Sequence, residues 1–143
     1  MKKKEIKILL VDDEQDILEI VGYNLSQEGY KIVTASNGRE AIAVAKKELP
    51  HLIIMDVMMP EMDGMEACEA SRKLPELNNV IITFLTARSE DYSQVAGFEV
   101  GADDYIAKPI KPKLLVSKVK ALLRRLKEVD SSATENLTLG NII

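Results

Sequence analysis

The sequence has a single cysteine, Cys68, and no long apolar run. One thiol cannot form a disulfide within the chain and has no second thiol for a zinc site, so Cys68 is interpreted as a packing residue. The longest apolar runs, such as VIITFL at 80–85, are too short to span a bilayer. The basic start MKKKEIK leads into a strand-like run rather than a signal peptide. These absences predict a cytoplasmic protein that does not contact a membrane.

An excess of positive charge is also missing. The net charge is −4 and the isoelectric point is about 5.1. Binding to a phosphate backbone depends on clustered lysine and arginine, so any contact with DNA must come from another part of the protein. The length of 143 residues, with 46% hydrophobic and 29% charged residues, fits one globular domain and leaves no room for a second complete one.

Short apolar runs alternate with longer helical patterns along the chain. The expected strands lie at 6–11, 30–35, 52–55, 80–85 and 104–107. The expected helices lie at 14–29, 38–49, 64–73, 90–99 and 111–128. Nearly continuous apolar strands that alternate with helices are typical of parallel sheets covered on both faces. The sequence therefore predicts an α/β fold of the (βα)5 type, a doubly wound five-stranded parallel sheet.

Three of the helical segments carry an apolar face that we expect to be buried. The predicted buried residues are Ile17, Ile20, Val21 and Leu25; Ala41, Ile42, Ala45 and Leu49; and Leu114, Leu115, Val119, Leu122, Leu123 and Leu126. Beyond them, KEVDSSATEN at 127–136 is polar and typical of a linker. The last residues, LTLGNII at 137–143, resume a strand-like pattern, which suggests the start of a further unit.

Polar residues follow four of the five expected strands. They are Asp12 and Asp13, Asp56, Thr86, and Lys108. Because ligands bind beyond the carboxyl ends of parallel strands, these side chains should meet at one edge of the sheet. Three carboxylates together need either raised pKa values or a cation, and a few hard oxygen ligands favour Mg²⁺. A carboxylate nucleophile, a metal, a lysine and a hydroxyl are what aspartyl-phosphate chemistry requires, so Asp56 is predicted to accept a phosphoryl group.

Each of these residues, taken alone, also has a simpler interpretation. Asp12 or Asp13 could cap the first helix, Asp56 could begin a turn, Thr86 could cap the fourth helix, and Lys108 could be a surface lysine. Four such coincidences at one edge of a single sheet are much less probable than a shared site.

His51 precedes the third expected strand, at the opposite end of the sheet. It is therefore predicted to be non-catalytic, and the phosphoryl-donating histidine must belong to another protein.

Four motifs, LLVDDEQDI, LIIMDVMMPEMDG, FLTARSE and GADDYIAKPI, resemble the receiver domain of bacterial two-component response regulators. The resemblance extends from residue 5 to about residue 126. It implies a flavodoxin-like, CheY-like fold with strand order 2-1-3-4-5. The C-terminal segment resembles the junction of the OmpR/PhoB winged-helix subfamily, which implies a receiver domain at 1–126, a linker at 127–136 and the start of a truncated DNA-binding effector domain at 137–143.

The same resemblance implies roles for the residues around Asp56. A sensor histidine kinase would phosphorylate Asp56, and Mg²⁺ would be bound by Asp13, Asp56 and the backbone carbonyl of Met58, with Asp12 holding a metal-bound water. Lys108 would bind a phosphoryl oxygen.

Further residues are assigned to signalling and to backbone geometry. Thr86 and Tyr105 would form a switch pair, in which the hydroxyl moves to the phosphate and the ring turns inward. The peptide bond before Pro109 would be cis, and Gly64 would allow the tight backbone that follows the acceptor.

The resemblance also implies that phosphorylation promotes a homodimer through the fourth helix, fifth strand and fifth helix. Asp104 would pair with Lys118, and Asp103 with Arg125, across the two-fold axis. Apolar contacts are expected around Val95 and Leu115 or Leu122. Where the subfamily has a basic residue and a glutamate, this chain has Gln94 and Leu114.

Other functions stay open. A phosphatase of the haloacid dehalogenase type also uses a strand-end aspartate with Mg²⁺, but it places a second aspartate two residues later, where this chain has Met58. The protein could instead be a stand-alone receiver that acts by protein contact, with or without phosphorylation. We expect no enzyme acting on outside substrates, but a switch that supports only its own phosphorylation and dephosphorylation.

Overall fold

The computed structural model describes residues 5–59, 62–87 and 99–135. Strands and helices alternate along the chain. They are β1 (Lys7–Val11), α1 (Gln15–Gln27), β2 (Lys31–Ala35), α2 (Gly38–Glu48), β3 (Leu52–Asp56), α3 (Gly64–Arg72), β4 (Ile81–Ala87), β5 (Asp104–Lys108) and α5 (Pro112–Glu135). Each predicted strand is confirmed to within two residues at either end. The helix predicted at 90–99 lies largely outside the described residues.

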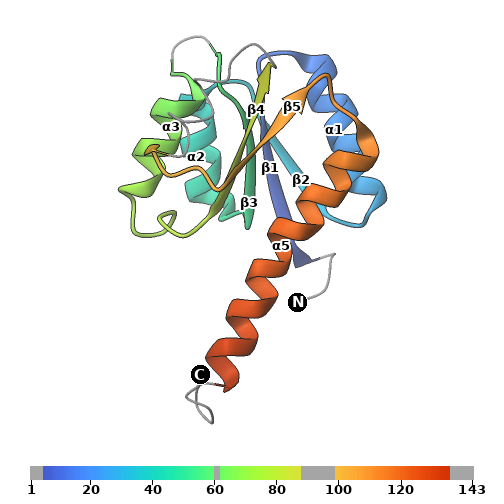
Figure 1. The fold of residues 1–143 in the computed structure, drawn as a ribbon. Helices are drawn as coiled ribbons and strands as arrows, with labels where there is room; N and C mark the ends of the chain where they lie inside the picture. Colours follow the sequence, from blue (N-terminus) through green and yellow to red (C-terminus); the bar gives the residue numbers. More distant parts are fainter. Residues whose placement is uncertain (1–4, 60–61, 88–98, 136–143) are drawn as a thin grey trace.

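The five strands form one parallel sheet in the order β2-β1-β3-β4-β5, which confirms the predicted fold and strand order. In Figure 1, α1 and α5 cover one face of this sheet, and α2 and α3 cover the other. Each face has its own apolar core, one packed under α1 and α5 and one under α2 and α3. The central strand β3 is buried at all five positions because helices cover it on both sides.

The helices α2 and α3 begin at well-formed caps beside the sheet's carboxyl edge. Asn37 accepts a hydrogen bond from the backbone N–H of Glu40 at 2.8 Å. At the start of α3, Asp63 and Glu66 form a reciprocal capping box, with the Glu66 N–H 2.9 Å from Asp63 Oδ1. The sequence thus fixes where both helices start, directly next to the loop that follows β3.

Three residues predicted to be buried are exposed. Ile20 is 46%, Leu49 54% and Leu114 47% exposed. Ile20 lies off the line of buried α1 residues, and Leu114 precedes the fully buried Leu115 by one position, a rotation of about 100° around a helix. Leu49 is the C-cap of α2 in a left-handed conformation, with φ 49°, so it leaves the helical face altogether.

Helix α5 continues to Glu135, beyond the predicted end at 128 and through most of the predicted linker. The sequence from 113 to 135 contains neither glycine nor proline, the two residues that most strongly interrupt a helix. Figure 1 shows the C-terminal part of α5 extending away from the sheet. The division into receiver, linker and effector start remains a prediction. Within the described ranges, no helix combines the length and apolar character that a membrane crossing requires.

Candidate functional site

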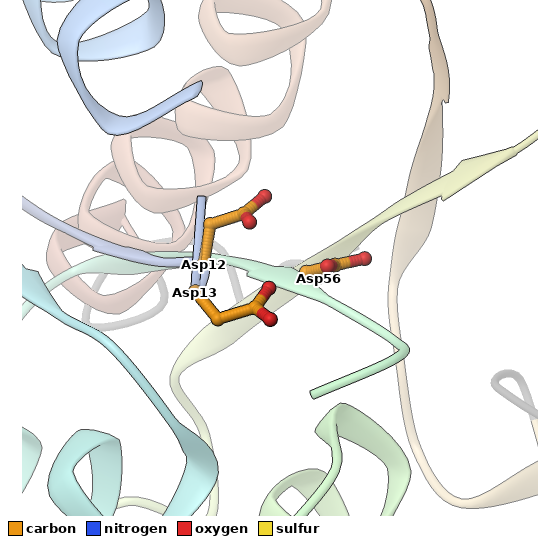
Figure 2. Close-up of side chains that lie close together, drawn as sticks. All are labelled: Asp12, Asp13 and Asp56. Carbon is orange, nitrogen blue, oxygen red and sulfur yellow. The ribbon is translucent and has the colours of Figure 1, made fainter. Parts of the chain in front are cut away.

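Three carboxylates meet at the carboxyl edge of the sheet. Asp12 and Asp13 follow β1, and Asp56 is the last residue of β3. The neighbouring strands pair Val11 with Met55, which places their ends side by side. One oxygen from each carboxylate lies within 4.8 Å of the others, and Figure 2 shows the three groups clustered beyond the strands. The predicted convergence of these aspartates is therefore observed.

Lys108, the last residue of β5, reaches over the end of β4 to the same cluster. Its Nζ lies 3.4 Å from Asp12 Oδ2 and 3.5 Å from Asp56 Oδ2. The Lys108 side chain is only 22% exposed, so it is not an ordinary surface lysine. One ammonium facing three carboxylates leaves the cluster with an excess of negative charge.

The excess negative charge and burial perturb the protonation of the cluster. The pKa of Asp56 is raised from 3.8 to about 6, first by burial and then by the negative charge of Asp12, while Lys108 and a backbone hydrogen bond from Met58 oppose the shift. Burial also raises the pKa of Asp12. Burial alone would lower the pKa of Lys108, but the charges of Asp56 and Asp12 outweigh it and raise that pKa. Keeping Asp12 and Asp56 ionised in this cluster therefore lowers the stability of the folded protein.

Two polar atoms at this edge lack a hydrogen-bond partner within the described residues. Asp12 Oδ2 is buried, and its contact with Lys108 is an ion pair without hydrogen-bond geometry. Thr86 Oγ1, on β4, is also buried and unpaired. Clustered hard oxygen ligands with excess negative charge fit a divalent cation such as Mg²⁺, and the free hydroxyl fits an oxyanion beside it. The residues present could hold a metal.

The structure excludes the alternative in which Asp12 or Asp13 caps the first helix. The N-cap of α1 is Glu14, and no side chain caps that helix. Asp12 Oδ1 instead accepts the backbone N–H of Glu14 at 2.9 Å. One Asp12 oxygen therefore holds the turn before α1, while the other faces the cluster. Neither Asp12 nor Asp13 is the helix cap.

The backbone near Asp56 is unusually tight. A Cβ atom added to Gly64 would lie 2.4 Å from the backbone oxygen of Asp56, so only glycine fits there. Space, rather than a left-handed φ, imposes this requirement. The side chain of Met58 is 61% exposed, so the metal role predicted for Met58 depends on its backbone alone. The Lys108–Pro109 bond is cis, as the resemblance implies.

The two predicted switch residues lie on neighbouring strands. Phe84 pairs with Tyr105 and Thr86 with Ala107, so Thr86 and Tyr105 are diagonal neighbours on one face of the sheet. Tyr105 is half-buried, and Lys118 Nζ lies 4.9 Å from its ring centroid and donates to its backbone oxygen at 2.8 Å.

The ion pairs predicted across a dimer axis form within one chain. Lys118 Nζ lies 3.9 Å from Asp104 Oδ1, and Arg125 Nη2 lies 3.3 Å from Asp103 Oδ1. Val95 and Gln94 lie outside the described residues.

The predicted dimer contacts of Leu115 and Leu122 need correction. Both residues are buried in the chain's own core under α5. The face of α5 that packs on the sheet cannot also meet a partner, so these two leucines are removed from the predicted interface.

The sequence interpretation missed a second charged cluster, centred on Arg72 at the end of α3. Arg72 donates to the backbone oxygens of Gly101 at 2.9 and 2.7 Å, Val80 at 2.6 Å and Asn78 at 3.2 Å, and to Asp103 Oδ2 at 3.0 Å. The N–H of Ile82 also donates to Asp103 Oδ2, at 2.8 Å. Arg72 carries no motif in the sequence, because its partners lie in two other segments, at 78–80 and 101–103.

His51 and Cys68 both make structural contacts. His51 lies at the amino end of β3, where its Nδ1 accepts the backbone N–H of Lys7 at 3.1 Å. Cys68 is buried, with its thiol 3.5 Å from the oxygen of Val100, and burial raises the thiol pKa to about 11. Cys68 is therefore a packing residue, as predicted.

Comparison with known proteins agrees with this geometry. Residues 8–120 match the family described as "Response regulator receiver domain". The chain is 45% identical over 119 residues to the alkaline phosphatase synthesis transcriptional regulatory protein PhoP of Bacillus subtilis, covering 83% of this chain and 49% of that protein. It is 43% identical to the probable transcriptional regulator ycf27 of Pyropia yezoensis, covering 92% of this chain and 53% of that one.

Solved structures show the same fold. The chemotaxis response regulator CheY4 of Vibrio cholerae superposes with a TM-score of 0.78 at 36% identity, covering 82% of this chain and 98% of that one. The fold is thus the CheY-like, flavodoxin-like arrangement. The chain belongs to the response regulator receiver domain family, and its curated relatives support placement in the OmpR/PhoB subfamily. It spans about half the length of those relatives.

Proposed function

We propose that this receiver domain accepts a phosphoryl group on Asp56 from a histidine of a sensor kinase and thereby switches a surface for its partners. One observation carries the proposal. Asp56 lies at the end of a fully buried strand, in a cluster of three carboxylates that a single lysine only partly neutralises. Such a cluster costs stability unless a cation and a phosphoryl group use it.

In the proposed reaction, a carboxylate oxygen of Asp56 attacks the phosphorus atom. The bond between phosphorus and the donor's imidazole nitrogen breaks, and its electron pair stays on that nitrogen. Asp12, Asp13, Asp56 and the Met58 carbonyl would hold Mg²⁺, which supplies neutralisation of charge on the phosphoryl oxygens when bound. Lys108, already 3.5 Å from Asp56 Oδ2, supplies a second positive charge to the same oxygens.

The switch follows from the unpaired hydroxyl of Thr86. That hydroxyl has no hydrogen-bond partner in the structure, and it would donate a hydrogen bond to a phosphoryl oxygen on Asp56. Moving Thr86 changes the space beside Tyr105, its diagonal neighbour on β5, and Tyr105 turns inward. The phosphoryl group biases the conformation because it bonds to Thr86 in only one of the two states. Thr86→Ala should therefore accept phosphate but respond poorly.

The names and lengths of the relatives suggest further partners besides the kinase. Two relatives carry the names of transcriptional regulators and are about twice as long as this chain. We therefore propose that phosphorylation promotes a two-fold dimer through the fourth helix, β5 and α5. A C-terminal domain beyond Ile143 would bind DNA. Reading the gene past Ile143 tests this part, and a stop codon there would contradict it. A cytoplasmic location is part of the proposal.

Intact-mass spectrometry after incubation with a small acyl phosphate and Mg²⁺ tests the phosphoacceptor. We expect one stable phosphoryl adduct, absent in Asp56→Asn and present in Asp16→Asn. Asp16 is the matched control because it is an exposed aspartate in the first turn of α1, outside the cluster. Adduct formation in Asp56→Asn would contradict the assignment. Continuous release of phosphate over many turnovers would instead favour a phosphatase.

A further inference from the structure

Residues 62–64, which lead into the first turn of α3, lie between the acceptor aspartate and the first turn of α2. On one side, Gly64 contacts Asp56, since a Cβ atom at Gly64 would lie 2.4 Å from the Asp56 backbone oxygen. The N–H of Gly64 also donates to the oxygen of Val57 at 2.9 Å. Any displacement of this turn of α3 therefore acts directly on the backbone of Asp56.

On the other side, the contact is made by Gly38, the first residue of α2. Its N–H donates to the backbone oxygen of Met62 at 3.0 Å. A Cβ atom at Gly38 would lie 2.4 Å from that oxygen and 2.9 Å from Met62 Cγ. Because the closest atom belongs to the backbone, no side-chain rotation can relieve such a contact. Glycine is required at Gly38 by space, since the residue is helical.

Neither helix can easily yield at this contact. The start of α2 is held by the Asn37 cap and by Glu40, whose Oε1 accepts from the backbone N–H and the hydroxyl of Ser36. The start of α3 is held by the capping box of Asp63 and Glu66. An atom added at Gly38 would press on Met62, directly before the Asp63 cap, and must therefore move the start of α3 relative to α2.

We propose that Gly38 is a positioning residue for the acidic cluster. It lets the first turn of α3 approach α2 closely enough for Gly64 to set the backbone of Asp56 relative to Asp12 and Asp13. The inference rests on the proposed function of Asp56. Helix α2 contributes no residue to the cluster, yet through Gly38 it would control metal affinity and phosphorylation rate.

The test compares Gly38→Ala with Gly22→Ala. Gly22 lies in the middle of α1, and a Cβ atom there would make ordinary contacts, 3.5 Å from Leu10 Cδ1 and 3.8 Å from Ile32 Cγ2. Mg²⁺ affinity is measured by calorimetry, and phosphorylation by a small acyl phosphate is followed by mass, at a temperature where circular dichroism shows all variants folded. For Gly38→Ala we expect about tenfold weaker Mg²⁺ binding and about tenfold slower phosphorylation.

Two controls separate positioning from a loss of stability. Gly22→Ala should stay within about twofold of wild type in both measurements. Asn37→Ala removes the cap of α2 without adding an atom beside Met62, so it should lower the melting temperature but keep affinity and rate within about threefold. A Gly38→Ala variant with wild-type Mg²⁺ affinity and phosphorylation rate would overturn the inference. So would an Asn37→Ala variant whose affinity and rate fell as far as those of Gly38→Ala.

Wild-type protein provides a measurement that does not depend on the folding of Gly38→Ala. Saturating Mg²⁺ should slow hydrogen exchange of the Gly38 amide at least about threefold and leave the Gly22 amide unchanged, because only Gly38 bonds to the turn beside Asp56. An unresponsive Gly38 amide would overturn the inference. A wild-type protein that neither bound Mg²⁺ nor accepted phosphate would refute the proposed function itself.

Discussion

The acidic cluster around Asp56 and the cluster around Arg72 distribute their charges in opposite ways. Arg72 donates to three backbone oxygens and to Asp103, and Asp103 also pairs with Arg125 and with the N–H of Ile82. The Asp56 cluster has three carboxylates, one lysine and a buried Asp12 oxygen without a hydrogen bond. In the first arrangement Arg72 and Asp103 both have hydrogen-bond partners, whereas the second has an excess of carboxylates and a buried oxygen without a hydrogen bond.

This difference indicates that the Arg72 cluster stabilises the fold, whereas the Asp56 cluster serves a function. A charge with its hydrogen bonds satisfied stabilises the fold, and losing one partner leaves the other uncompensated. A cluster with surplus charge lowers stability, and it is retained where a ligand completes it. The comparison therefore predicts opposite signs for substitutions in the two clusters.

The largest stability effect should come from Arg72→Ala. It would leave Asp103 and the oxygen of Val80 without their strongest donor, so the free energy of unfolding should fall by about 3 kcal/mol. Urea denaturation followed by circular dichroism measures the change. Arg72→Lys should recover only part of the loss, because an ammonium lacks the planar fork of donors. A loss below about 1 kcal/mol would show that this cluster is not the structural one.

The opposite sign is expected for Asp56→Asn in metal-free protein. The pKa of Asp56 is raised from its ordinary value of 3.8 to about 6 in the folded state, so the folded protein holds this proton more tightly than the unfolded chain. Stability should therefore fall as pH rises from about 4 to about 6. At pH 7 the penalty is about 2 to 3 kcal/mol.

Unfolding curves of wild type and Asp56→Asn across that pH range measure this contribution. The variant should be the more stable at pH 7, by about 2 kcal/mol, and the two should converge near pH 4. A variant less stable than wild type at pH 7 without metal would show that the carboxylate is already compensated.

Thr83 and Thr86 refine the comparison, because both are buried on β4 and both have an unpaired hydroxyl. Thr83 lies between Ile81 and Leu85, in strand positions whose side chains face the core under α1 and α5. Thr83→Val should therefore raise stability by about 1 kcal/mol and leave phosphorylation unchanged. Thr86→Val should still be phosphorylated on Asp56, but Tyr105 should no longer respond to phosphorylation. NMR of the Tyr105 ring follows this response. An equal Tyr105 response in both variants would refute the assigned switch.

The smallest stability effect is expected for the half-buried pair of Asp104 and Lys118, which belongs to neither cluster. Asp104→Lys should change the stability of the monomer by about 1 kcal/mol or less. In analytical ultracentrifugation the phosphorylated variant should be monomeric, and adding Lys118→Asp should partly restore the dimer. A dimer that ignored both changes would place the interface on another face.

The strands and the acidic cluster could be predicted from the sequence because both depend on residues that are adjacent along the chain. Four of the five apolar runs are followed directly by a polar residue of the site, and parallel strands bring those residues to one edge. The Arg72 cluster could not be predicted, since its partners are backbone oxygens brought together only by the folded chain. Gly38 was missed for the same reason. Its need for space arises from Met62, in another segment.

Helix ends and burial show a similar limit. Apolar periodicity correctly placed Val21 and Leu25 on the buried side of α1, but it missed Leu18 and could not show that Ile20 faces solvent. The polar composition of 127–136 did not indicate that the helix predicted to end at 128 continues to Glu135. A polar composition is typical of a segment outside the core, but without glycine or proline it does not end a helix.

The most direct test of the central claim is the effect of Mg²⁺ on the thermal unfolding of wild type and Asp56→Asn at pH 7. If the surplus charge around Asp56 exists to be completed by a cation, the melting temperature of wild type should rise saturably with Mg²⁺. The same additions should have a much smaller effect on Asp56→Asn. Equal responses of the two proteins, or no response of wild type, would contradict the account.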